Sequence, residues 1–217
     1  MADRARARHH FHELPLVAIL RGITPAEVVA IGHVLVEAGF RLIEVPLNSP
    51  DPIESIRRLS RELGSQATVG AGTVLSVAEV ADVSAAGGSL IVSPNMNPAV
   101  IAATRANDLF SGPGVCTPTE AFAAIDAGAD FLKLFPAEHL GPATVKAWRA
   151  VLPAEMPLIP VGGISPESMH EWQDAGVAGF GLGSNLYRPG MTPAAVRCVA
   201  DASVLAYRSS KCPPCGP

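Results

Sequence analysis

The stretch AGADFLKLF, residues 127–135, joins a helix ending to the start of a buried strand. A glycine after a helix can take the left-handed conformation that closes the last turn, and a short apolar run behind it is typical of a buried strand. The same Ala-Gly pair stands at residues 38–39, 86–87 and 175–176, and an apolar run follows each time. The chain is therefore predicted to alternate helices and strands.

Eight such apolar runs are spread along the chain. They cover residues 16–20, 42–45, 68–70, 90–92, 110–115, 131–135, 158–161 and 179–182. Alternating strands and helices predict a parallel sheet, and eight units in about 200 residues predict a single (β/α)8 TIM barrel of the α/β class. An open doubly wound sheet is the alternative, which the absence of a GxGxxG motif after the first strand disfavours.

Helix starts lie between these runs, because a capping residue stands directly before proline, which is favoured at the first helical position. The six pairs are Thr24-Pro25, Asp51-Pro52, Asn97-Pro98, Thr117-Pro118, Ser165-Pro166 and Thr192-Pro193. A glutamate three positions after the cap predicts a capping box or its Asp counterpart. The matching pairs are Thr24 with Glu27, Asp51 with Glu54, Ser76 with Glu79, and Thr117 with Glu120.

The composition fits one globular domain. Of 217 residues, 48% are hydrophobic and 17% are charged, which is enough apolar material for a sizeable core. We expect the barrel to span residues 14–208, with an N-terminal tail over residues 1–13 and a C-terminal tail over residues 209–217. Each tail holds a possible ligand cluster, namely residues 9–12 (HHFH) and residues 212–215 (CPPC). We expect the first to be a solvated segment and the second to have no zinc or redox role.

The charge of the chain limits the class of partner. Its net charge of −4 offers no general attraction to nucleic acid or to anionic lipid. The apolar run at residues 15–20 is stopped by Arg21, too soon for a signal segment or a membrane span. A small-molecule partner and a cytoplasmic address are the expectation.

Barrel enzymes of this architecture carry their chemistry at the carboxyl ends of the strands. The side chains at those positions include a cation, a carboxylate, a hydroxyl, an amine and two apolar residues. They are Arg21, Glu44, Thr73, Pro94, Lys133 and Phe135. This set is the candidate active site.

Lys133 is an amine within an apolar strand. Alternation places it on one face with Phe131 and Phe135. In a barrel both faces are covered, so desolvation should lower the pKa of the amine and leave it able to attack a carbonyl. The alternative is a structural ion pair with Glu44. Glu44 itself has two interpretations, that ion pair or a general base with a raised pKa.

Two glycine turns follow the last two predicted strands. They are Gly162-Gly163 and Gly183-Ser184, and each leads into a segment predicted to be helical. Backbone N–H groups at such turns face anions, and the loops after strands seven and eight form the usual phosphate site of TIM barrels. A phosphorylated substrate is therefore predicted.

With these residues in view, the chain resembles the aldolases that act on 2-keto-3-deoxy-6-phosphogluconate and its galactonate epimer, over roughly residues 14–208. The matching stretches are PLVAILRGITP, IEVPLNSP, VGAGTVL, SPNMNP, FLKLFPAE, VGGISPE and GLGSNLY. The resemblance implies a class I aldolase without metal or cofactor, and a homotrimer. It also implies that Lys133 forms the Schiff base and that Glu44 accepts and donates the proton.

The same resemblance suggests which epimer is used. Gluconate-type enzymes carry an arginine where this chain has Asn48 and a threonine where it has Val161, so this chain is similar to the galactonate type. Its products would be pyruvate and glyceraldehyde 3-phosphate. Arg21 and Thr73 are expected to hold the substrate carboxylate, and Pro94 and Phe135 to shield the imine. The gluconate enzyme, or a 4-hydroxy-2-oxoglutarate aldolase of the same family, is the alternative.

Three other classes compete with this interpretation. Another phosphate-binding barrel, such as an isomerase or a synthase, would share the glycine turns without an imine-forming lysine. A non-catalytic phosphosugar-binding protein would bind the same ligand without turnover. A metal-dependent aldolase is disfavoured, because no cluster of His and carboxylate residues with ligand spacing stands at the strand ends.

Overall fold

The computed structural model describes residues 3–209 and has the predicted alternation of strands and helices. The strands are β1 (Leu16–Ile19), β2 (Leu42–Pro46), β3 (Thr68–Gly72), β4 (Leu90–Val92), β5 (Phe110–Gly112), β6 (Gly114–Val115), β7 (Leu132–Leu134), β8 (Leu158–Pro160) and β9 (Phe180–Leu182). The helices are α1 (Asp3–Glu13), α2 (Val28–Ala38), α3 (Pro52–Leu63), α4 (Val77–Ala85), α5 (Pro98–Ala106), α6 (Pro118–Asp126), α7 (Ala137–Arg149), the short 3₁₀ helix η1 (Pro166–Ser168), α8 (Met169–Asp174) and α9 (Pro193–Ser209). Each of the eight predicted apolar runs overlaps at least one of these strands.

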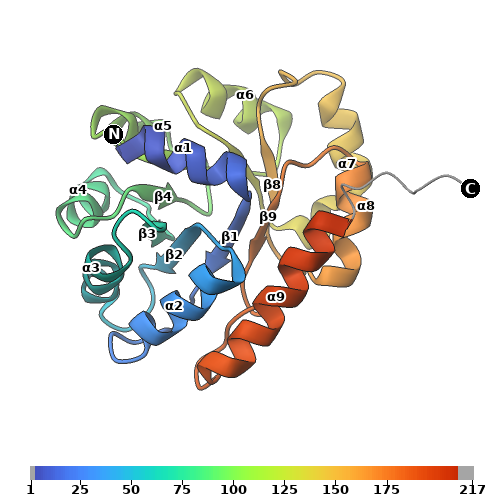
Figure 1. Ribbon diagram of the computed structural model, residues 1–217. Helices are drawn as coiled ribbons and strands as arrows, with labels where there is room; N and C mark the ends of the chain where they lie inside the picture. Colours follow the sequence, from blue (N-terminus) through green and yellow to red (C-terminus); the bar gives the residue numbers. More distant parts are fainter. Residues whose placement is uncertain (1–2, 210–217) are drawn as a thin grey trace, which may run out of the picture.

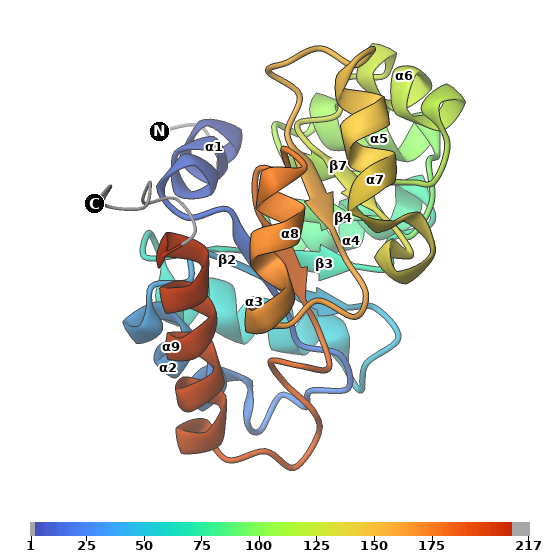
Figure 2. The same cartoon turned by 90° about the vertical axis from the view of Figure 1, so that its right-hand side faces the viewer.

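All strand pairs are parallel. One sheet has the order β5-β4-β3-β2-β1-β9, and a second has the order β6-β7-β8. Figure 1 shows the strands at the centre with helices around them, and Figure 2 shows α8 and α9 side by side on the outside. The α/β class with a parallel sheet is confirmed.

Two contacts connect the sheets. Only Pro113 separates β5 from β6, and the Lys133 amide donates to the Pro113 carbonyl oxygen over 2.9 Å. On the other side, Val161 after β8 forms a parallel bridge with Gly181 of β9. The two sheets are therefore linked at both of their meeting points.

The predicted alternation of faces is present in the strands. Phe131, Leu42 and Ile159 belong to one buried apolar cluster, which lies on the inner face of the strands. Their neighbours Leu132 and Ile43 belong to a second buried cluster, which includes the apolar sides of the helices. Because side chains alternate along a strand, a charged residue at an inner position is surrounded by apolar groups.

The prediction of a solvated tail is wrong for residues 3–13, which form α1. Phe11 is 4% exposed, and its ring stacks on Phe131 at a centroid distance of 5.5 Å and lies 5.6 Å from Phe110. Arg4 forms an ion pair of 2.6 Å with Asp130. Sequence periodicity could not show this helix, because its apolar contacts are few and its partners lie about a hundred positions away along the chain. The CPPC motif lies outside the described residues.

Helix ends follow the predicted signals in part. Ser165-Pro166 starts only the 3₁₀ helix η1, and the turn at Gly183-Ser184 does not lead directly into a helix, because α9 begins at Pro193. Ser76 with Glu79 and Thr117 with Glu120 form complete capping boxes, and the four predicted glycines after helices have positive φ. Helix α2, however, starts at Val28, because the Glu27 carboxylate accepts hydrogen bonds from both the amide and the hydroxyl of Thr24 and a separate turn precedes the helix. Asp51 has φ 41° and makes no side-chain cap.

Candidate active site

Lys133 and Glu44 lie on the inner face of β7 and β2. Lys133 is 4% exposed and Glu44 is 1% exposed. Burial lowers the pKa of the Lys133 amine; the negative charge of Glu44 opposes this and the positive charge of Arg21 adds to it. Burial raises the pKa of the Glu44 carboxyl, against the opposing charges of Lys133 and Arg21. Both groups are thus shifted toward their neutral forms.

The two groups do not form a close ion pair. Within residues 3–209, no ion pair of 4.0 Å or less joins Lys133 to Glu44, and Glu44 Oε2 is buried without a hydrogen-bond partner. Lys133 Nζ instead lies 4.7 Å from the centre of the Phe135 ring. An unpaired buried carboxylate oxygen costs free energy, and the close ion pair that was the alternative prediction for these two residues is not present in the described part of the chain.

Gly72, at the end of β3, gives the Glu44 carboxylate its room. A Cβ atom on Gly72 would lie 2.5 Å from Glu44 Oε1 and 2.7 Å from its Cδ. Real Cβ contacts are not that short, so any larger residue would push the carboxylate out of its position. Gly72 in this VGAGT stretch therefore leaves space for the Glu44 carboxylate. The same stretch also carries the hydroxyl of Thr73.

Thr73 follows directly and has φ 59°, in the left-handed region. A β-branched residue there is strained, and such strain persists where the surrounding structure holds the backbone, often at functional sites. Pro94, in the loop after β4, is half-buried. These two residues lie at the predicted strand ends.

Arg21 lies at the exposed end of β1 and contacts the loop after β2. Its Nη1 donates a hydrogen bond of 2.6 Å to Asn48 Oδ1. The next residue, Gly22, donates its amide to Ser49 Oγ over 3.0 Å. The guanidinium is close enough to influence both Lys133 and Glu44 electrostatically.

A cavity of about 140 Å³ opens beside these groups. It is lined by seven of the predicted site residues, namely Arg21, Phe135, Val161, Gly162, Gly163, Gly183 and Ser184. Glu44, Thr73, Pro94 and Lys133 do not line it. Lys133 reaches its wall through the contact with the Phe135 ring. A small ligand in this cavity would therefore contact a cation and two glycine turns, and the Phe135 ring in the cavity wall lies next to the Lys133 amine.

The two glycine turns are held next to each other. Asn185 Nδ2 donates a hydrogen bond of 2.8 Å to the carbonyl oxygen of Ile164. Gly162 and Gly163 have φ values of 114° and 68°, which L side chains rarely adopt. The side chain of Glu138 packs on this turn, since a Cβ atom on Gly163 would lie 2.8 Å from Glu138 Cγ.

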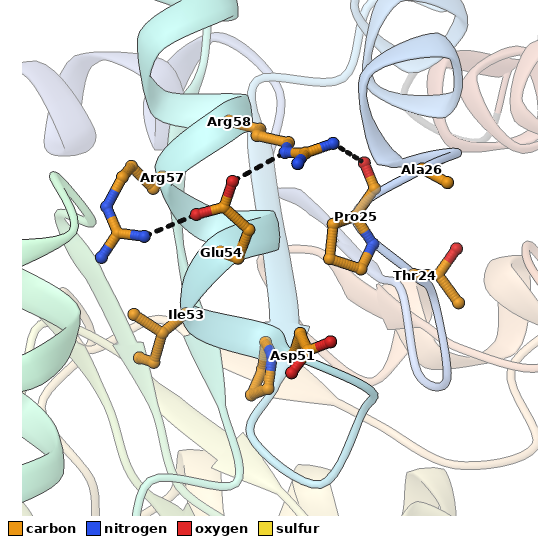
Figure 3. Close-up of a pocket in the computed structure, with 9 residues that line it drawn as sticks. Thr24, Pro25, Ala26, Asp51, Ile53, Glu54, Arg57 and Arg58 are labelled. Atoms are coloured by element: carbon orange, nitrogen blue, oxygen red, sulfur yellow. Dashed lines mark hydrogen bonds and ion pairs between the residues drawn. The ribbon is translucent and has the colours of Figure 1, made fainter.

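A larger hollow, of about 730 Å³, lies between the segment before α2 and the start of α3 (Figure 3). Its charged side chains contact one another, because Glu54 accepts hydrogen bonds from Arg57 at 2.6 Å and from Arg58 at 2.8 Å (Figure 3). Arg58 also donates to the carbonyl oxygen of Pro25. This hollow offers paired surface charges and no buried reactive group, so the smaller cavity is the candidate active site.

Two searches cover residues 3–209 only. They contain no group of three or more His, Cys, Asp or Glu side chains that could hold a metal ion. No helix in this part of the chain is long and apolar enough to cross a membrane.

Comparison with known proteins gives the family. The model of a family described as "Aldolase: KDPG and KHG aldolase" matches residues 8–194. The chain belongs to this aldolase family. The predicted family is confirmed.

Relatives of this aldolase are similar over nearly the whole chain. The probable 2-dehydro-3-deoxy-6-phosphogalactonate aldolase of Rhizobium meliloti (strain 1021) is 47% identical over 195 residues, which cover 90% of this chain and 92% of that protein. The 2-dehydro-3-deoxy-6-phosphogalactonate aldolase of Escherichia coli (strain K12) is 45% identical over 198 residues, covering 91% and 97%. A solved structure described as "Native KDPGal structure" is 45% identical, with a TM-score of 0.90 over 91% of this chain and 96% of that chain.

Three residues of this aldolase were not among the predicted site residues, although Asn48 was used to predict the epimer. Gly72 and Glu138 fix the space around Glu44 and around the glycine turn, and Asn48 contacts Arg21. Asn48 carried a usable signal, since it is a polar residue just after the end of β2. The other two could not be found from sequence, because their contacts depend on how separate strands and loops pack.

Proposed function

We propose that the protein is a class I aldolase that cleaves 2-dehydro-3-deoxy-6-phosphogalactonate to pyruvate and D-glyceraldehyde 3-phosphate in D-galactonate catabolism. One observation carries the proposal. The Lys133 amine is buried beside the cavity, with its pKa lowered and with no ion pair of 4.0 Å or less to Glu44. Membership of the aldolase family and the names of the relatives support the substrate.

The first step is formation of the imine. The neutral Lys133 amine attacks the C2 ketone of the substrate to give a carbinolamine. Glu44, whose raised pKa favours its acid form, gives its proton to the departing hydroxyl. Water leaves, and a protonated imine faces a Glu44 carboxylate.

The second step is cleavage of the C3–C4 bond. Glu44, now ionised, takes the proton of the C4 hydroxyl, the bonding pair moves into the imine, and glyceraldehyde 3-phosphate leaves. An enamine remains on Lys133. Glu44 returns its proton to C3, directly or through a water molecule. Water then hydrolyses the imine and frees pyruvate and the amine.

The remaining site residues bind the substrate in this proposal. Arg21 and Thr73 hold the carboxylate, because a guanidinium makes two parallel bonds with it. The phosphate contacts the turns at Gly162-Gly163 and Gly183-Ser184. Pro94 and Phe135 shield the imine, and Val161 faces C4, where the two epimers differ. No metal or cofactor takes part.

Further parts of the proposal concern the architecture. A single closed (β/α)8 barrel over residues 14–208 is supported by the continuity of β5 and β6 around Pro113 and by the bridge between Val161 and Gly181. A homotrimer is supported by exposed apolar side chains at Leu75, Val77 and Phe122, since such groups are often covered in assemblies. Light scattering during size-exclusion chromatography tests the trimer. The cytoplasmic address belongs to the same proposal.

Borohydride reduction in the presence of pyruvate tests the chemistry. The expected result is one pyruvate-derived adduct, located by mass spectrometry on the peptide that contains Lys133. An adduct on another lysine, or none, would refute the mechanism. A barrel isomerase, a synthase or a non-catalytic binding protein would give no adduct.

Pyruvate release from the two epimers, assayed side by side with EDTA present, tests the substrate. We expect the galactonate epimer to be preferred. The alternative is a gluconate or 4-hydroxy-2-oxoglutarate aldolase. The description of the family model supports this alternative, because it names both of those substrates in abbreviated form. A preference for either would keep the mechanism and remove the roles assigned to Asn48 and Val161 in choosing the epimer.

A further inference from the structure

Two hydrogen bonds join the loop after β1 to the loop after β2. Arg21 Nη1 donates to Asn48 Oδ1 at 2.6 Å, and the Gly22 amide donates to Ser49 Oγ at 3.0 Å. Ser49 is 8% exposed, and its own amide donates to the carbonyl oxygen of Pro46. The bond between Gly22 and Ser49 therefore joins the two loops. The bond between Arg21 and Asn48 holds the Arg21 side chain against the loop after β2.

The bond to Asn48 changes what Arg21 can do. Arg21 is an exposed side chain with many rotamers, and ordering such a side chain during binding costs about 0.5–1.5 kcal/mol. Asn48 holds one N–H of the guanidinium, and the guanidinium has five. Among the described residues the guanidinium has no other hydrogen-bond partner, so its other N–H groups can bind a carboxylate. Because the acceptor is an uncharged amide, the positive charge of Arg21 is not neutralised.

We propose that Asn48 is a positioning residue, which holds the guanidinium of Arg21 over the cavity so that it can receive the carboxylate of the substrate. This inference rests on the proposed function. It gives Asn48 a physical role in binding, in addition to its use in predicting the galactonate type. Asn48 is itself exposed and does not line the cavity, so it acts through Arg21.

Two substitutions separate the parts of this role. Asn48→Leu has nearly the same shape but no acceptor, so Arg21 should lose its fixed orientation. We expect KM for the keto acid to rise about 2- to 12-fold, which is the cost of one ordered side chain, with kcat within twofold of wild type. Asn48→Asp keeps the acceptor but adds a charge. It should raise KM at least as far, because its carboxylate competes with that of the substrate.

A double-substitution cycle gives a result that a merely structural role would not. With Arg21→Met as background, Asn48→Leu should have no further effect on kcat/KM, since nothing remains to be positioned. Asn107→Leu is the matched control, because Asn107 is another exposed asparagine, which donates to Ala103 on α5 and is away from the cavity. It should have wild-type KM.

The outcomes distinguish this inference from the proposed function. A wild-type enzyme with no turnover would refute the proposed function, and the inference with it. Wild-type turnover with unchanged KM in Asn48→Leu would overturn the inference alone. So would a loss that persists in the Arg21→Met background, or a fall in kcat with unchanged KM. Wild-type melting temperatures for the single variants would show that the loops remain folded.

Discussion

Phe131, directly before β7, and Lys133, within it, are two positions apart, yet they lie in opposite environments. Phe131 packs against Phe11 and Phe110 at ring distances of 5.5 and 5.6 Å. Lys133 has a ring beside it and no ion pair of 4.0 Å or less to Glu44 in the part of the chain that the structure describes. The amino end of the strands is packed for stability, and the carboxyl end keeps charged groups poorly paired.

The strongest way to break this comparison is Lys133→Met. A methionine fills similar volume without an amine, so no imine can form, and we expect pyruvate release to fall below detection. Borohydride with pyruvate should add no mass. Circular dichroism should show that the fold is intact, because the packed end is untouched. Residual turnover with an adduct elsewhere would contradict the assignment.

Glu44→Gln should have the next largest effect. The amide cannot exchange the proton, and loss of a positioned acid or base lowers the rate by about 10² to 10⁴. The Lys133 amine remains, so trapping with borohydride should still give the adduct, at a lower rate because imine formation has lost its proton donor. Glu62→Gln, on an exposed carboxylate that contacts only His33 among the described ion pairs, serves as the control. An unaffected kcat would return Glu44 to a structural role.

Gly72→Ala sharpens the comparison by moving the base without removing it. The new Cβ would lie 2.5 Å from Glu44 Oε1, so the carboxylate has to shift. A displacement of about 1 Å can cost about 10² in rate, and we expect kcat to fall by that order. Steady-state kinetics on the purified variant measure this. Wild-type kcat would show that Glu44 has room that the structure does not provide.

The pH dependence of trapping tests whether the carboxyl end is desolvated. Burial lowers the pKa of Lys133 below its ordinary value of 10.5. Between the lowered pKa and 10.5, the amine is already neutral while an ordinary lysine is still charged. The trapping rate with pyruvate should therefore rise with pH and level off below pH 10.5. A rate that still rises up to pH 10.5 would mean that water reaches the amine.

Phe11→Ala should have the smallest effect on chemistry and a large one on stability. Removing a buried phenylalanine lowers the free energy of unfolding by about 3–5 kcal/mol. Chemical denaturation measures the loss. At low temperature, kcat and KM should stay near wild type, because the ring contacts of Phe11 are with His12, Phe110 and Phe131, none of which is a candidate site residue. A loss of activity without a loss of stability would contradict the separation of the two ends.

Local signals in the sequence predicted most of the fold. The Ala-Gly helix endings, the capping boxes at Ser76 and Thr117 and the eight apolar runs depend on neighbouring residues, and all are found in the structure. Helix α1 was missed because Phe11 finds its partners on strands far along the chain. The extra turn before α2 was missed because it depends on how the Glu27 carboxylate is used.

The site was predictable where it depends on strand ends. Seven predicted residues line one cavity, because parallel strands end at the same edge of a sheet. The absence of a close ion pair between Lys133 and Glu44 could not be predicted, since it depends on a distance. The contact of Gly72 with Glu44 likewise requires coordinates.

Helix α1 has a consequence for proton chemistry at the opposite end of the molecule. Ala7 and Phe11 belong to the same buried cluster as Ile159 and Val161, which reach the strand ends near the cavity. Without α1, water could enter the interior at the amino end of the strands and solvate the Lys133 ammonium. In a chain shortened to begin at residue 14, the pKa of Lys133 should then move back toward its ordinary value. The first helix would thus keep water away from a residue more than a hundred positions later.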